Sequence, residues 1–173
     1  MGNGANDEVD AANDGVSASK FASLRRLGAK DFSRFAVEMQ HVSEQVQLKL
    51  VEQLPEFRKL AADAIASAEK AFEAALKSND ENDRELNAAF KQWRDSLDKV
   101  LENPELTLEE RLLVTREIGR TVEMQSAKNT ESKSFKTRLF QQLVIGAAVA
   151  VGIVAVAVVG GKVGLEQGGS NNA

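Results

Sequence analysis

Residues 143–161 read LVIGAAVAVGIVAVAVVGG, nineteen positions without a charged, amide or hydroxyl side chain. At about 1.5 Å of rise per residue, an α-helix of this length is roughly 28 Å long, close to the roughly 30 Å hydrocarbon core of a bilayer. Inside that core every backbone N–H and C=O group must be satisfied within the segment, so a single span has only the α-helix available. The stretch therefore predicts a transmembrane helix, which we place at 139–162.

Two other structures fit part of this pattern. A buried core helix can be as apolar, although such helices seldom exceed roughly 14 residues without a polar side chain. The alternation of Val and Ala over 154–158 also has the period of two that is typical of a strand. Because no other part of the chain predicts a partner strand, the transmembrane helix is the favoured interpretation.

The charges around this stretch predict an orientation. The formal net charge is −4, too small to indicate a nucleic-acid partner. Residues 126–142 carry four basic side chains against Glu131, whereas the charges of Lys162 and Glu166 cancel beyond the stretch. By the positive-inside rule the large N-terminal part stays in the cytoplasm. We therefore expect a single-pass protein that is tail-anchored in a membrane, with no signal peptide.

The rest of the chain has the periodicity of amphipathic helices. Apolar stripes with steps of three or four residues run over 32–54, 57–76, 86–101 and 108–122. Pro55, which lacks an N–H, predicts a break after the first stripe. Thr107 and Glu110 have the spacing of a capping box at the start of the fourth helix.

These stripes predict an all-α fold, an antiparallel helical bundle of about four amphipathic helices followed by a single C-terminal transmembrane helix. An elongated coiled coil, in which Pro55 only kinks a long helix, is the alternative. The chain then divides into a disordered acidic tail at 1–18, a cytosolic helical bundle at 19–125, a basic juxtamembrane linker at 126–138, the transmembrane helix at 139–162 and a short polar tail at 163–173.

The sequence offers little that predicts chemistry. Cysteine is absent and His41 is the only histidine, so the spacing of Glu38 and His41 cannot complete a carboxylate-bridged metal site. Glu117 and Arg120 stand three residues apart, as a solvated surface pair does. We therefore predict no catalytic, metal-binding or cofactor-binding residue and no enzymatic activity.

Two surface features stand out from this background. One face of the predicted span gathers small residues and would allow close helix packing in lipid; its members are Gly146, Ala150, Ala157, Gly161 and Gly164. Ala148, Gly152 and Ala155 form a second small face, roughly opposite. Basic residues form the other feature and could contact an anionic membrane surface; they are Lys20, Arg25, Arg26, Lys30, Arg34, Lys133, Lys136 and Arg138.

The sequence thus predicts a tail-anchored membrane protein whose helical domain is a non-enzymatic scaffold or adaptor. Its expected partners are the lipid bilayer and an unidentified protein, with homo-oligomerisation as an option and no nucleic acid. The alternative is a membrane-active effector or small pore former that oligomerises through the small faces of the span.

Overall fold

A computed structural model describes residue 24 and residues 27–76, 81–127 and 133–163 of the chain. Within these ranges the fold is all-helical, with no strand, as the sequence predicted. Six helices follow one another: α2 (Ala29–Met39), α3 (Glu44–Glu52), α4 (Phe57–Ala75), α5 (Glu81–Glu102), α6 (Leu108–Ser126) and α7 (Lys133–Val163). The predicted tail at 1–18 lies outside the described residues.

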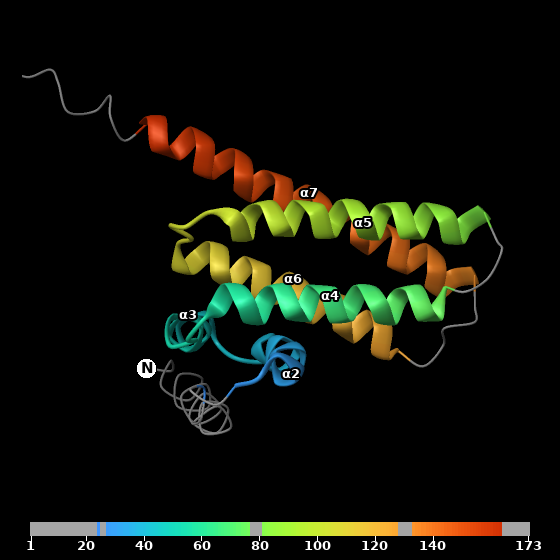
Figure 1. The fold of residues 1–173 in the computed structure, drawn as a ribbon, viewed down its shortest axis with the longest axis horizontal. Helices are drawn as coiled ribbons and strands as arrows, with labels where there is room; N and C mark the ends of the chain where they lie inside the picture. Colours follow the sequence, from blue (N-terminus) through green and yellow to red (C-terminus); the bar gives the residue numbers. More distant parts are fainter. Residues whose placement is uncertain (1–23, 25–26, 77–80, 128–132, 164–173) are drawn as a thin grey trace, which may run out of the picture.

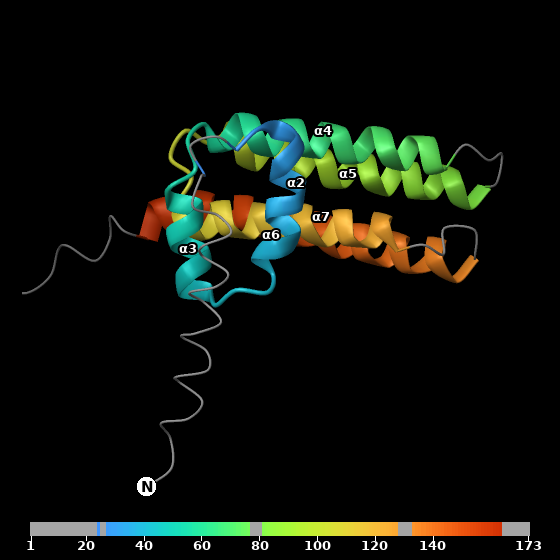
Figure 2. The same ribbon diagram turned by 90° about the horizontal axis from the view of Figure 1, so that it is seen from below.

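The long helices are arranged as a two-layered bundle. Figures 1 and 2 show α4 beside α5 in one layer and α6 beside α7 in the other, with the two short helices α2 and α3 lying across them. Helices α5 and α7 share the most extensive contact, and α6 packs on α2, α3, α4 and α7. Helix α6 is therefore the central helix of the bundle.

One continuous core joins all six helices. Its largest fully buried side chains come from all six, which confirms the predicted helical bundle; they include Phe32, Phe35, Met39, Val51, Ile65, Leu86, Trp93, Leu97, Leu112, Ile118 and Leu139. Aromatic rings form part of this core, and the centroids of Phe90 and Trp93 lie 5.1 Å apart. The core extends past the predicted bundle boundary at residue 125, because Leu139, Leu143, Ala147 and Ala150 of α7 are buried in it.

The single long helix expected over 32–54 is wrong. Helix α2 ends at Met39 and α3 begins at Glu44, with a turn between them. The Gln47 amide donates hydrogen bonds to the carbonyl oxygens of Met39 (2.6 Å) and Val42 (2.7 Å). These bonds tie the Gln47 side chain of α3 to the end of α2 and to the turn, so the turn is held in place without glycine or proline.

The break at Pro55 is confirmed. Helix α3 ends at Glu52, α4 begins at Phe57, and Glu56 between them adopts a left-handed conformation with φ of 51°. The chain therefore changes direction here, and α3 lies across α4 instead of continuing into it (Figure 2), which excludes the continuous coiled coil.

The capping box at the start of α6 is also confirmed. The Thr107 hydroxyl accepts a hydrogen bond from the Glu110 N–H at 3.2 Å, and the Glu110 carboxylate accepts one from the Thr107 N–H at 2.8 Å. We expect Thr107→Ala to lower the free energy of unfolding by about 0.5 to 2 kcal/mol, because one of these donors loses its acceptor. Urea unfolding followed by circular dichroism measures this loss, and Thr107→Ser is expected to retain most of the stability.

Helix α7 occupies much of the predicted span and part of the predicted linker. It begins at Lys133, so residues 133–138 of the predicted basic linker are helical. Within the described residues, no helix combines the length and the apolarity that crossing a bilayer requires. The transmembrane helix at 139–162 is not supported by this finding, and it returns below only as a proposal.

Candidate functional site

The most distinctive feature of the bundle is the packing of α7 on α5 and α6, which we call the α7 seam. Its α7 side consists of Leu139, Leu143, Gly146, Ala147 and Ala150, which are all buried. Their spacing of three or four residues places them on one face of the helix. The small residues let α7 approach α5 closely, and Figure 1 shows α7 diverging from α5 toward its C-terminal end.

The centre of the α7 seam is Gly146. A Cβ atom at this position would lie 2.1 Å from Oε1 of Glu117 on α6, and 2.7 and 2.8 Å from Cδ1 and Nε1 of Trp93 on α5. Such distances are far shorter than van der Waals contact, so only glycine fits here. Three helices therefore meet at one point through a glycine, an indole and a carboxylate.

Glu117 is the unexpected member of this group. Its side chain is only 6% exposed, so the prediction of a solvated Glu117–Arg120 pair is wrong for Glu117. Arg120 nevertheless pairs with it, with Nη1 3.3 Å from Oε2. Burial raises the pKa of Glu117, while the charge of Arg120 and the indole N–H of Trp93 act in the opposite direction.

The raised pKa of Glu117 predicts a pH dependence of stability. The folded protein holds this proton to higher pH than the unfolded chain, so the full stability is present below the unfolded pKa near 4.5 and falls as the pH rises through the folded pKa. We expect Glu117→Gln, which is uncharged and of similar size, to flatten this fall and to raise the melting temperature at neutral pH. Thermal unfolding of both proteins from pH 4 to pH 8 measures the effect, and a larger fall in the variant would contradict it.

The opposite face of α7 is apolar and exposed. Phe140 is 36% exposed, Val144 46%, Ile145 51% and Val151 54%. Ala148 is exposed on the same side, and a Cβ at Gly152 would meet no atom within 4 Å. The two faces of α7 thus differ in environment: one is inside the bundle and the other is uncovered.

The predicted small-residue face is only partly visible. Gly146 and Ala150 lie together in the α7 seam, where they contact the bundle itself. Ala157 and Gly161 belong to α7, but their side-chain surroundings lie outside the described residues, as does Gly164 altogether.

The predicted basic residues are not brought together as one surface in the described part. Arg34 on α2 and Arg138 on α7 are both exposed. Lys136 instead forms an ion pair with Asp83 of α5, with Nζ 2.6 Å from Oδ1, and the Asp83 side chain is only 2% exposed. This ion pair holds the N-terminal end of α7 to the start of α5. Lys30 and Lys133 are helical positions without a described side chain, and Lys20, Arg25 and Arg26 lie outside the described residues.

A small pocket lies beside this ion pair. It has a volume of about 210 Å³ and is lined by Glu85, Leu86, Lys136, Thr137 and Phe140. The pocket is open to solvent and its only cationic lining group is already paired with Asp83. We assign no ligand to it.

Other polar groups on the bundle hold helices together. Arg116 of α6 donates two hydrogen bonds to Oε1 of Gln47, at 2.9 and 2.6 Å, and so fixes α3 on α6.

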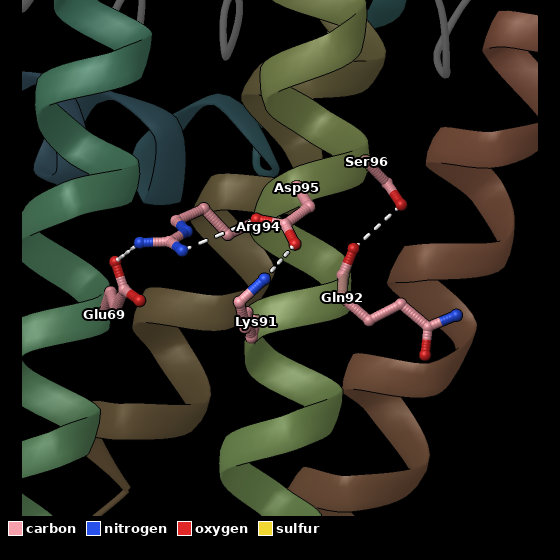
Figure 3. A network of polar contacts seen from close by, with 6 residues as sticks. All are labelled: Glu69, Lys91, Gln92, Arg94, Asp95 and Ser96. Carbon is pink, nitrogen blue, oxygen red and sulfur yellow. Dashed lines mark hydrogen bonds and ion pairs between the residues drawn. The ribbon is translucent and has the colours of Figure 1, made fainter.

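A second polar network joins α4 to α5. Figure 3 shows Arg94 reaching from α5 to Glu69 on α4, while Lys91 pairs with Asp95 at 2.6 Å. The hydrogen bond from Lys91 lowers the pKa of Asp95. These residues join helices and converge on no open cleft.

No set of residues suited to metal binding was found among the described side chains. His41 is exposed, with Nε2 3.9 Å from a carboxylate oxygen of Glu123.

Sequence reasoning missed Glu117 as a site residue, although its position carried a signal. Glu117 shares a helix face with Val114, Ile118 and Thr121, which are all buried, so the spacing alone placed it on the core side of α6. The chain matches no family model, no curated protein and no solved structure. The described fold defines the class of the protein as an all-α bundle. Any proposal for its function has to be argued from its own residues.

Proposed function

We propose that the protein is a tail-anchored membrane protein, in which the apolar C-terminal stretch holds a helical interaction domain at the cytoplasmic surface of a bilayer. The observation that carries this proposal is the sequence at 143–161, nineteen residues without a polar side chain. The exposed apolar face of α7 supports it, because Val144, Ile145 and Val151 are about half exposed in the described part of the chain.

The nature of this face favours lipid over protein as its contact. Protein interfaces combine an apolar centre with a polar rim, whereas no charged side chain occurs between Arg138 and Lys162. Basic residues precede this region, as expected for the cytoplasmic flank of a membrane segment.

For the bundle we propose a non-enzymatic role in binding another protein. Support comes from the contacts of three charged side chains, Arg94, Arg116 and Lys136. Each of them joins one helix to another and so stabilises the bundle instead of forming part of a catalytic site. The partner stays unidentified, and no cofactor or nucleic acid is needed by this proposal.

The pore-forming alternative has less support. A ring of copies requires both small faces of α7 to contact other copies, but Gly146 and Ala150 of the first of these faces are buried in the α7 seam. Oligomerisation through this face would require α7 to leave the bundle first.

Membrane extraction tests the anchor. We expect the full chain, expressed in cells, to stay with membranes after carbonate washing, and a Val154→Lys, Val158→Lys double variant to be released. Both positions lie beyond Ala150, the last buried position described on α7, so none of the residues that define the α7 seam is replaced. Val154→Leu with Val158→Leu is the matched control and should remain with membranes. Complete release of the unaltered chain would refute the proposal.

A further inference from the structure

The α7 seam and the proposed membrane anchor use the same residues. Residues 143–150 form the first part of the uncharged stretch, yet Leu143, Gly146, Ala147 and Ala150 are buried against the bundle. A helix face packed on protein is not available to lipid, so these residues cannot serve both surfaces at once.

The apolar residues that remain outside the α7 seam are too few to cross a bilayer by themselves. Only eleven residues, 151–161, follow Ala150 before the stretch ends. At about 1.5 Å per residue they form a helix of roughly 16 Å, about half of the roughly 30 Å that a bilayer core requires. A full crossing therefore needs residues 143–150 as well, and α7 must separate from α5 to provide them.

We propose that the α7 seam is a reversible latch, in which α5 and α6 compete with the lipid bilayer for one face of α7. The inference rests on the proposed membrane anchor. In the latched form described here, Leu143 and Ala150 lie in the bundle; in the released form they lie in lipid, and Trp93 loses its cover. The latch thus keeps the anchor in a form that cannot cross a bilayer until α7 is released.

Two contacts hold the latch closed. Gly146 lets α7 approach Trp93 and Glu117, and the ion pair of Lys136 with the buried Asp83 fixes the N-terminal end of α7. The centre opposes closure at the same time, because it places the carboxylate of Glu117 out of water, with Arg120 as its charged partner among the described residues. The free-energy cost of this buried charge lowers the stability of the latched form relative to the released form.

Two glycines on α7 provide a matched test. A Leu side chain at Gly146 would collide with Trp93 and Glu117, whereas Gly152 has open space around it. Gly146→Leu and Gly152→Leu add the same apolar side chain to the same helix, so their intrinsic effects on lipid affinity are equal. Only the first is expected to open the latch.

The readout uses the full-length protein with vesicles of phosphatidylcholine and phosphatidylserine. Trp93 is the only tryptophan and is fully buried, so quenching of its fluorescence by acrylamide reports release of α7. We expect Gly146→Leu to expose Trp93 in buffer and to bind vesicles about 10 to 100 times more tightly than the unaltered protein, because the released form is no longer a minor population. Gly152→Leu should leave Trp93 buried as in the unaltered protein and should bind vesicles much less tightly than Gly146→Leu.

The outcomes separate the latch from the anchor. If Gly146→Leu exposes Trp93 but binds vesicles no more tightly than Gly152→Leu, the latch is refuted and the anchor stands. If none of the proteins binds vesicles, even with Trp93 exposed, the membrane anchor is refuted and the latch with it.

A second variant covers the case in which Gly146→Leu loses its helical circular dichroism spectrum. Glu117→Gln removes the buried charge and should tighten the latch, so it is expected to bind vesicles more weakly than the unaltered protein while remaining helical. Equal or stronger binding by Glu117→Gln would overturn the proposal.

Discussion

Replacing Gly119 by alanine is expected to destabilise the bundle by about 1 to 3 kcal/mol, a large effect for a single methyl group. A Cβ atom at Gly119 would lie 2.2 Å from the carbonyl oxygen and 2.6 Å from the carbonyl carbon of Ala36 on α2. Both are backbone atoms, which cannot rotate away as a side chain can. Helices α2 and α6 would have to move apart. Phe32 and Phe35, which are buried on α2, would then lose packing contacts in the core.

The control for Gly119→Ala is Gly152→Ala. Alanine is favoured over glycine inside a helix by about 1 kcal/mol, and a Cβ at Gly152 meets no neighbour. Gly152→Ala is therefore expected to leave the stability unchanged or slightly higher, while Gly119→Ala lowers the melting temperature by about 2 to 12 °C. Differential scanning calorimetry of the two variants measures both. Equal melting temperatures would contradict the close approach of α2 and α6.

Much of the fold could be predicted because helix periodicity is a local property of the sequence. The stripes assigned to 57–76, 86–101 and 108–122 correspond to α4, α5 and α6, and most of their apolar members are buried. Pro55 and the pair of Thr107 with Glu110 act on neighbouring backbone groups, so their effects could also be read from spacing alone.

The turn between α2 and α3 could not be predicted in this way. The apolar steps of three and four continue from Met39 through Val42 to Val46, so the periodicity carries no sign of a break. The turn is held by the Gln47 side chain, which is itself fixed by Arg116 some seventy positions further along the chain. A contact so distant in sequence leaves no local signal.

The candidate site was hidden for a related reason. Gly146 and Ala150 were recognised as a surface for close helix packing, and they do pack closely, but on the bundle of the same chain. Periodicity identifies the face that a helix buries and does not identify its partner. The burial of Glu117 depends on that partner, since α7 is one of the helices that cover it.

The second large effect concerns Trp93, which is fully buried beside Gly146. Trp93→Ala is expected to cost about 3 to 5 kcal/mol, from the lost transfer of the indole and the cavity that remains. Because that cavity would lie directly against Gly146, a larger residue there should partly fill it. Gly146→Val is therefore expected to destabilise Trp93→Ala less than it destabilises the unaltered protein, because the contact with the indole is gone and only the contact with Glu117 remains.

A double-mutant cycle measures this difference: it compares the unfolding free energies of the unaltered protein, Gly146→Val, Trp93→Ala and the double variant. We expect a coupling energy of about 0.5 to 3 kcal/mol. Circular dichroism during urea unfolding follows all four proteins, since fluorescence is lost with Trp93. Ile65→Ala is the matched background: Ile65 is buried on α4, which shares no extensive contact with α7, so Gly146→Val should destabilise that variant as much as it destabilises the unaltered protein. Additive effects in the Trp93→Ala background would show that the glycine and the indole are not in contact, and the α7 seam would then need a different centre.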